Sequence, residues 1–183
     1  MKARWIWVVL VALAGLAVYA ASGFATAQTP SPGFAGKTLA MATFGEIDSH
    51  VQAEPEWAEK LTTKGLSDLY VQQNTWDPTP PAPNGTGCGC IPTTGWHTHP
   101  GPSLVIVTQG SVAVYDAEDP TCTPHVYTAN TPNNAFVDIG GGEVHMIRDE
   151  SGAPAQTIAV QLVPSGAARR IDADNPYPGT CPS

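Results

Sequence analysis

The feature that most restricts the fold is a succession of short, strand-like segments in the second half of the chain, each followed by turn residues. In residues 156–163, for example, Ile158, Val160 and Leu162 fall on one face of a strand and the residues between them on the other. The other segments of this kind are residues 104–108, 111–115, 124–129, 135–139 and 144–148. This pattern predicts an all-β sandwich, barrel or jelly roll.

The first residues have the layout of a secretory signal peptide over residues 1–27. Lys2 and Arg4 precede an apolar run over residues 5–21, and small residues follow up to Ala27. We expect cleavage after Ala27 and export to an extracellular or periplasmic-type compartment. The alternative is an uncleaved membrane anchor, because the run approaches the roughly 20 residues that a helix needs to cross a bilayer.

The charge balance excludes one class of partner. Aspartate and glutamate number 16 against 8 lysines and arginines, so the formal net charge is −8 at pH 7. The leader contains Lys2 and Arg4 but no acid, so the remainder is more acidic than the whole chain. Such a surface repels phosphate backbones, and we therefore expect no nucleic-acid partner.

Four cysteines, Cys88, Cys90, Cys122 and Cys181, follow the predicted leader, and an even number in an exported chain indicates disulfides. A bridge between Cys88 and Cys90 would close a very small ring, so we expect Cys122 to pair with Cys181, or with Cys88 or Cys90. A thiolate metal site is disfavoured, because Cys-Gly-Cys lacks the two to four intervening residues that are usual in zinc sites.

Turn residues divide the rest of the chain. Residues 28–36, rich in proline and small polar residues, are predicted to be a linker. Residues 37–165 form the predicted β-barrel domain, and residues 166–183 a tail that packs on the barrel. Within the domain, residues 54–61 predict a short helical turn, because a proline occupies a first-turn position and two apolar residues fall on one face.

Three histidines have the spacing of metal ligands. His97 and His99 are two residues apart, so in a strand both imidazoles point to one side and can bind the same divalent ion. His145 opens another predicted strand, after the glycine-rich turn 140–142. Histidine pairs also occur in proteins without binding a metal. The prediction of a metal site therefore depends on the presence of both segments.

Together the two segments resemble the paired motifs of the cupin superfamily, which read G-x5-H-x-H-x3-E-x6-G and G-x5-P-x-G-x2-H-x3-N. The matching positions are His97, His99, Gly110, Gly142 and His145. With the flanking strands, the resemblance covers residues 37–163. It implies a double-stranded β-helix, which is a jelly-roll barrel, with a metal bound by the histidines.

The departures from the two motifs bear on function. Ser103 stands where the family has a metal-binding glutamate, and a neutral hydroxyl is a poor ligand for zinc, iron or manganese. The other departures are Ile91 and Asn134 for glycines, Gly140 for the proline and Asp149 for the asparagine. The resemblance therefore implies a site of three histidines without the glutamate.

Three neutral imidazoles suit a catalytic zinc or a ferrous ion, and the metal stays open among iron, zinc and manganese. Resemblance to three-histidine cupin dioxygenases permits, without requiring, a metal-dependent enzyme of dioxygenase type that acts on a small organic substrate. The alternative is a non-catalytic cupin that binds a small ligand or serves as a scaffold. Glu143, two residues before His145, is a candidate base or replacement ligand. The resemblance also allows a homodimer, and we expect membrane contact only if the leader is uncleaved.

Overall fold

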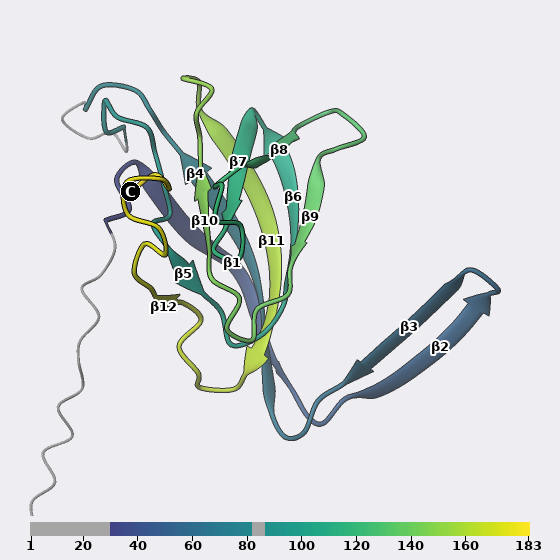
Figure 1. The fold of residues 1–183 in the computed structure, drawn as a ribbon. Helices are drawn as coiled ribbons and strands as arrows, with labels where there is room; N and C mark the ends of the chain where they lie inside the picture. The colour runs from purple at the N-terminus through teal and green to yellow at the C-terminus, as the bar shows by residue number, and fades with distance from the viewer. Residues whose placement is uncertain (1–29, 82–86) are drawn as a thin grey trace, which may run out of the picture.

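The chain folds into two antiparallel β-sheets that face each other, as the computed structural model shows for residues 30–81 and 87–183 (Figure 1). The predicted leader, residues 1–27, lies outside the described residues. In the two described ranges no helix is long and apolar enough to cross a membrane.

The first sheet has the strand order β1-β4-β11-β6-β9. The strand bounds are Phe34–Phe44 for β1, Ser67–Trp76 for β4, Ser103–Gln109 for β6, Ala135–Asp138 for β9 and Ala155–Pro164 for β11. Strand β1 begins inside the predicted linker. The central strand β11 pairs with both β4 and β6, so segments distant in sequence lie side by side.

The second sheet has the order β12-β5-β10-β7-β8. The bounds are His97–Thr98 for β5, Ser111–Asp116 for β7, His125–Thr128 for β8, His145–Arg148 for β10 and Ile171–Asp172 for β12. Strand β12 comes from the predicted tail, which therefore extends the sheet as well as packing on it. Two such sheets with crossing connections form a jelly roll, and the predicted fold class is confirmed.

The core consists of two clusters built around fully buried tryptophans, one between the sheets and the other on the outer face of the second sheet, beneath the tail. One holds Trp76, Val107, Val112, Ile147 and Ala155. The other holds Trp96, Ala113, Tyr115, Met146 and the cysteines Cys122 and Cys181. Aromatic side chains bury large apolar areas, so the first cluster holds the sheets together and the second holds the tail against the second sheet.

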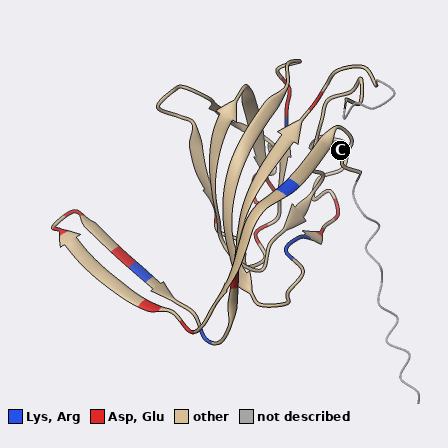
Figure 2. Cartoon of the chain, turned by 180° about the vertical axis from the view of Figure 1, so that it is seen from behind, with Lys and Arg blue, Asp and Glu red and all other residues tan. Residues whose placement is uncertain are grey.

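The first sheet buries its more polar face. In β11 the alternation is as predicted, but Thr157 and Gln161 point inward while Ile158 and its neighbours on that face stay partly exposed. On β6 the outward Leu104 is 58% exposed. Figure 2 shows that the strands of this sheet contain few lysine, arginine, aspartate or glutamate residues. The polar residues face inward because a pocket opens there.

Residues 54–61 are not helical, so that prediction is wrong. Strands β2 (Asp48–Glu54) and β3 (Trp57–Thr62) form an antiparallel hairpin that projects from the barrel, and we call residues 48–62 the arm (Figure 1). Trp57 and Leu61 share a face at a spacing of four in a strand as well as in a helix, and Pro55 lies in the turn. Trp57 is 54% exposed, so tertiary packing gives no reason for a helix here.

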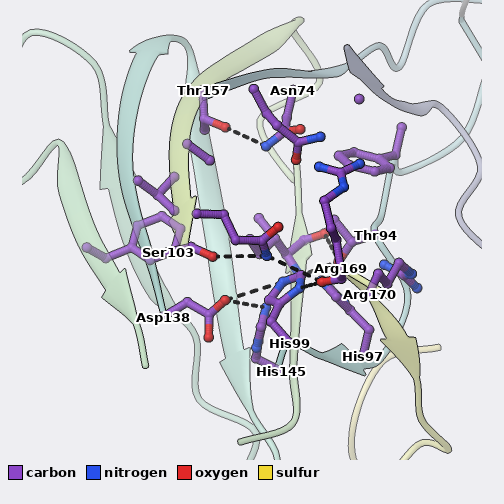
Figure 3. Close-up of a pocket in the computed structure, with 18 of the residues that line it drawn as sticks. Asn74, Thr94, His97, His99, Ser103, Asp138, His145, Thr157, Arg169 and Arg170 are labelled. Atoms are coloured by element: carbon purple, nitrogen blue, oxygen red, sulfur yellow. Dashed lines mark hydrogen bonds and ion pairs between the residues drawn. The ribbon is translucent and has the colours of Figure 1, made fainter. Parts of the chain in front are cut away.

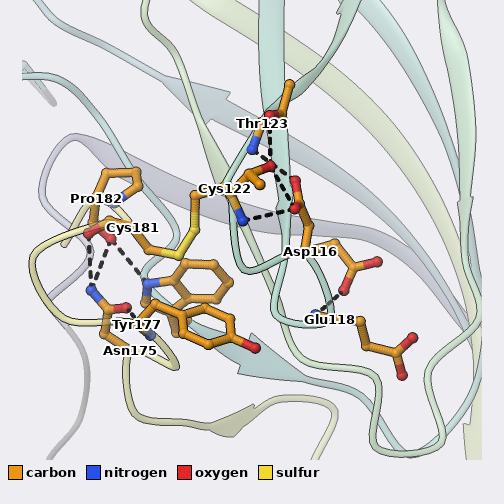
Figure 4. The surroundings of a disulfide bond; sticks show 11 residues. Asp116, Glu118, Cys122, Thr123, Asn175, Tyr177, Cys181 and Pro182 are labelled. Carbon is orange, nitrogen blue, oxygen red and sulfur yellow. Dashed lines mark hydrogen bonds between the residues drawn. A yellow bond between two sulfur atoms is a disulfide. The ribbon is translucent and has the colours of Figure 1, made fainter.

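Two disulfides are present, and one corrects the sequence analysis. Cys122 pairs with Cys181, one of the expected pairings, and fastens the tail beside the loop that follows β7 (Figure 4). Cys88 and Cys90, whose pairing we disfavoured, also form a bridge. Their Cα atoms are 5.1 Å apart, within the ordinary range, because the backbone turns back at Gly89 with a φ of +61°.

Candidate metal centre

Strand pairing brings the three predicted histidines together. His97 of β5 and His145 of β10 are direct Cα partners across the second sheet, and His99 follows two residues after His97. Their nitrogen donor atoms all lie within 4.8 Å of one another. Figure 3 shows the three imidazoles converging at the base of the pocket, His97 from β5, His99 from the residue directly after β5, and His145 from β10.

Hydrogen bonds to carbonyl oxygens determine which ring nitrogen carries the proton in two of the neutral histidines. The Nδ1 of His97 donates to the Gly95 oxygen at 2.8 Å, and the Nδ1 of His99 donates to the Arg169 oxygen. A carbonyl can only accept, so in the neutral rings the Nε2 atoms keep their lone pairs. This arrangement, with the second nitrogen held by the backbone, is the usual one for metal-binding histidine.

Burial favours the neutral form of His97 and His145. Loss of hydration lowers the pKa of His97 well below its usual value, and the charge that His145 would carry lowers it further. Burial also lowers the pKa of His145, while the nearby carboxylate of Asp138 acts in the opposite direction. Neutral imidazoles are the form that binds a metal, so the donor set fits a divalent ion at neutral pH.

The histidines border a pocket of about 270 Å³ between the two sheets. Asn74, Thr157 and Gln161 line it from the first sheet, while Arg169 and Arg170 line it from the tail. In Figure 3 the arginines lie on the opposite side of the histidines from Asp138. The size suits a small molecule, and the charges on the tail side are positive.

Some polar atoms of this pocket have no protein partner among the described residues. The Oε1 of Gln161 and the Nε1 of Trp76 are both buried and make no hydrogen bond within residues 30–81 and 87–183. A buried donor or acceptor without a partner costs about 1–3 kcal/mol. The pocket therefore offers both a donor and an acceptor to a polar ligand or to water.

Residues of the tail contact the side chains that form the site and hold them in place. The Arg169 carbonyl accepts from His99 and also from the Gln161 side chain at 3.3 Å. The Arg169 guanidinium stacks on the ring of Tyr70 at 4.6 Å, and Arg170 forms an ion pair with Asp172 at 2.6 Å. These contacts fix the tail backbone against the histidine that it orients.

Sequence reasoning missed one carboxylate. Asp138 is 7% exposed and lines the pocket, with its Oδ2 3.3 Å from the Nε2 of His99 and 3.8 Å from that of His145. The alternation of β9, in which Phe136 and Asp138 both line the pocket, is the signal that could have found it.

Glu143, the carboxylate that the sequence analysis singled out, lies elsewhere. It is outside the group of three histidines and lines a second cavity of about 130 Å³ together with Asp116 and His125, a cavity that His145 and Asp138 also border. Burial raises its pKa, and the negative charge of Asp116 raises it further. Its proposed role as a base or ligand therefore has no support from the first pocket.

The turn after β9 is built for glycine. Gly140 has a φ of +65°, and a Cβ there would lie 2.3 Å from the Gly101 oxygen; Gly141 has a φ of +68° and open space around the same position. We expect Gly141→Ala to cost about 1–2 kcal/mol for the left-handed backbone. Gly140→Ala should cost about 1–3 kcal/mol more, because the two loops must separate. Urea unfolding measures both, and equal losses would contradict the close contact.

Comparisons with known proteins find distant structural similarities only. No family model matches the sequence. No curated protein matches it. Similar solved structures include a cupin superfamily protein from Desulfitobacterium hafniense, with 7% identity and a TM-score of 0.37 over 69% of this chain and 81% of that one.

Two other similar structures belong to proteins of known activity. The polyketide cyclase RemF from Streptomyces resistomycificus is 15% identical, with a TM-score of 0.41 over 60% of this chain and 65% of that one. Peruvianin-I, a cysteine peptidase from Thevetia peruviana latex, is 20% identical, with a TM-score of 0.36 over 51% of this chain. The chain spans about half the length of peruvianin-I, 49%. None of these similarities assigns an activity.

Proposed function

We propose that this chain is an exported metalloenzyme of cupin type, whose histidines hold one divalent ion at the base of a pocket for a small organic substrate. The observation that carries the proposal is the convergence of His97, His99 and His145, with ring nitrogens within 4.8 Å of one another at the edge of that pocket. The ion would supply Lewis-acid or redox chemistry.

The residues that line the pocket favour catalysis by the metal ion over catalysis by a protein base. Among the described residues that line it, the one carboxylate is Asp138, which contacts the histidines, and no lysine or tyrosine lines it. Isomerase or lyase chemistry needs a positioned base that reaches the substrate. An oxygenase needs instead a metal with open positions and a dry, shaped pocket, and three imidazoles leave such positions.

The positive charge of the tail supports an acidic substrate. Arg169 and Arg170 both line the pocket, and Arg170 already pairs with Asp172. Arg169 has its guanidinium on the face of Tyr70, which leaves its edge for hydrogen bonds. The proposed substrate is therefore a small organic molecule that carries a carboxylate or another anionic group.

Oxygen consumption tests the proposal. The metal-free protein would be loaded with ferrous iron without air and mixed with small carboxylic acids, phenols, thiols and diketones. We expect dioxygen uptake with at least one acidic compound, and none with the same preparation of His145→Ala. Saturable binding of a compound at full iron occupancy, without any uptake across the panel, would favour the non-catalytic cupin instead.

Export after cleavage behind Ala27 and pairing of two barrels remain predictions. Two disulfides support an oxidising compartment for the folded chain. The bridges alone do not distinguish between extracellular and periplasmic-type compartments.

A further inference from the structure

Asp138 lies where its carboxylate can replace the missing glutamate as a metal ligand. Ser103, which stands at the glutamate position, is the first residue of β6, and its Cα partner on the neighbouring strand β9 is Asp138. Both side chains are buried and line the same pocket. A carboxylate is thus present one strand away from where the paired motifs place it.

The backbone orients this carboxylate toward the histidines. Its Oδ1 accepts a hydrogen bond from the Gly140 amide at 2.9 Å, which fixes the side chain. Its Oδ2 then lies 3.3 Å from the Nε2 of His99 and 3.8 Å from the Nε2 of His145. Figure 3 shows Asp138 directed at this pair of rings from the side of the pocket where Ser103 lies.

A cation between the Oδ2 of Asp138 and the Nε2 of His99 accounts for the short separation of these two atoms. In neutral His99 the proton is on Nδ1, which donates to the Arg169 oxygen, so Nε2 presents a lone pair. The Oδ2 of Asp138 presents lone pairs as well, and two acceptors 3.3 Å apart repel each other. Donor atoms bound to one ion at about 2.0–2.2 Å lie roughly 3–3.5 Å apart, which is close to the 3.3 Å and 3.8 Å that separate Asp138 from His99 and His145.

We propose that Asp138 is the fourth protein ligand of the divalent ion, and that it supplies from β9 the carboxylate that Ser103 cannot supply from β6. The inference rests on the proposed metal site. A fourth protein ligand would fill a tetrahedral zinc site and leave no position for substrate, whereas ions that take five or six ligands keep positions open. The site therefore favours iron or manganese over zinc for catalysis.

Cobalt titration of the metal-free protein tests the assignment without any activity assay. Co²⁺ would be added alone and its binding followed by visible absorption, in the wild type and in Asp138→Asn, which keeps the oxygen that accepts from Gly140. We expect the affinity to fall at least about 10-fold, and the absorption of any bound cobalt to change. Asp116→Asn, a carboxylate of the second cavity outside the histidine group, is the matched control and should bind like the wild type.

A second experiment moves the carboxylate to another strand. Asp138→Ala should lose affinity as Asp138→Asn does, and Ser103→Glu in the Asp138→Ala background should recover most of it. Such recovery identifies the carboxylate as a ligand, since a merely structural aspartate would not be replaced from another strand. Thermal unfolding of each metal-free variant identifies any that fails to fold.

The outcomes separate the two proposals. If the wild type binds no cobalt while folded, the proposed metal site itself fails. If the wild type binds cobalt and Asp138→Asn binds it equally well, the metal site stands and the assignment of Asp138 is overturned. The assignment is also overturned if Asp138→Ala folds, loses affinity and regains none of it with Ser103→Glu.

Discussion

Replacing His145 by alanine is expected to reduce the metal content of the purified protein from about one ion per chain to almost none. His145 is buried on β10 directly opposite His97, so its removal takes away one of the three donor atoms that converge on a single point. Elemental analysis of protein that has never contacted a nickel column measures the effect. His97→Ala should give the same result.

His50→Ala is the control for this loss. His50 lies on the arm and is exposed, so the same substitution changes neither the pocket nor the core, and the metal content should match that of the wild type. Equal metal content in His50→Ala and His145→Ala, with both proteins folded, would place any bound ion outside the histidine group.

Loss of the Cys122–Cys181 disulfide is expected to cost about 4 kcal/mol of unfolding free energy, because the bridge closes a loop across 59 residues and restricts the unfolded chain. Replacing both cysteines by serine and measuring urea unfolding without reductant gives the value. The tail would also lose its attachment next to Trp96, whose Nε1 donates to the Pro182 oxygen at 3.0 Å.

The other bridge is the matched control. Cys88 and Cys90 are only 2 positions apart in sequence, so the double serine variant should lose about 2 kcal/mol or less. Equal losses from the two double variants would show that loop closure does not explain the effect. A larger loss from the short bridge would contradict the prediction outright.

The histidine group was predictable because two local rules determine it. The spacing of two residues puts His97 and His99 on one side of a strand, and the second motif marks His145 at the start of another. The sequence could not show that β5 and β10 are neighbours with His97 opposite His145. The resemblance to a known arrangement supplied that part.

Asp138 was not predictable in the same way. Its closeness to the histidines depends on the register between β6 and β9, which pairs it with Ser103, and on the Gly140 amide that turns its carboxylate inward. Neither is a local property of the residues around it. Glu143 is nearer to His145 in sequence, yet the turn that contains it faces the second cavity.

The choice of buried face and the shape of the arm depend on tertiary structure too. Alternation in β11 is clear from the sequence, but hydrophobicity favours Ile158 and Val160 as the buried set, whereas the pocket requires Thr157 and Gln161 inside. In the arm, the spacing of Trp57 and Leu61 fits a helix and a strand equally. Pairing with β2 decides between them.

A thin hairpin adds little mass but considerable friction as a molecule diffuses. The arm projects from the barrel, so a single chain of this shape has a larger hydrodynamic radius than a sphere of equal mass (Figure 1). On a sizing column it elutes early and can be mistaken for a pair of chains. Light scattering, which reports mass independently of shape, is therefore the measurement to use when its subunits are counted.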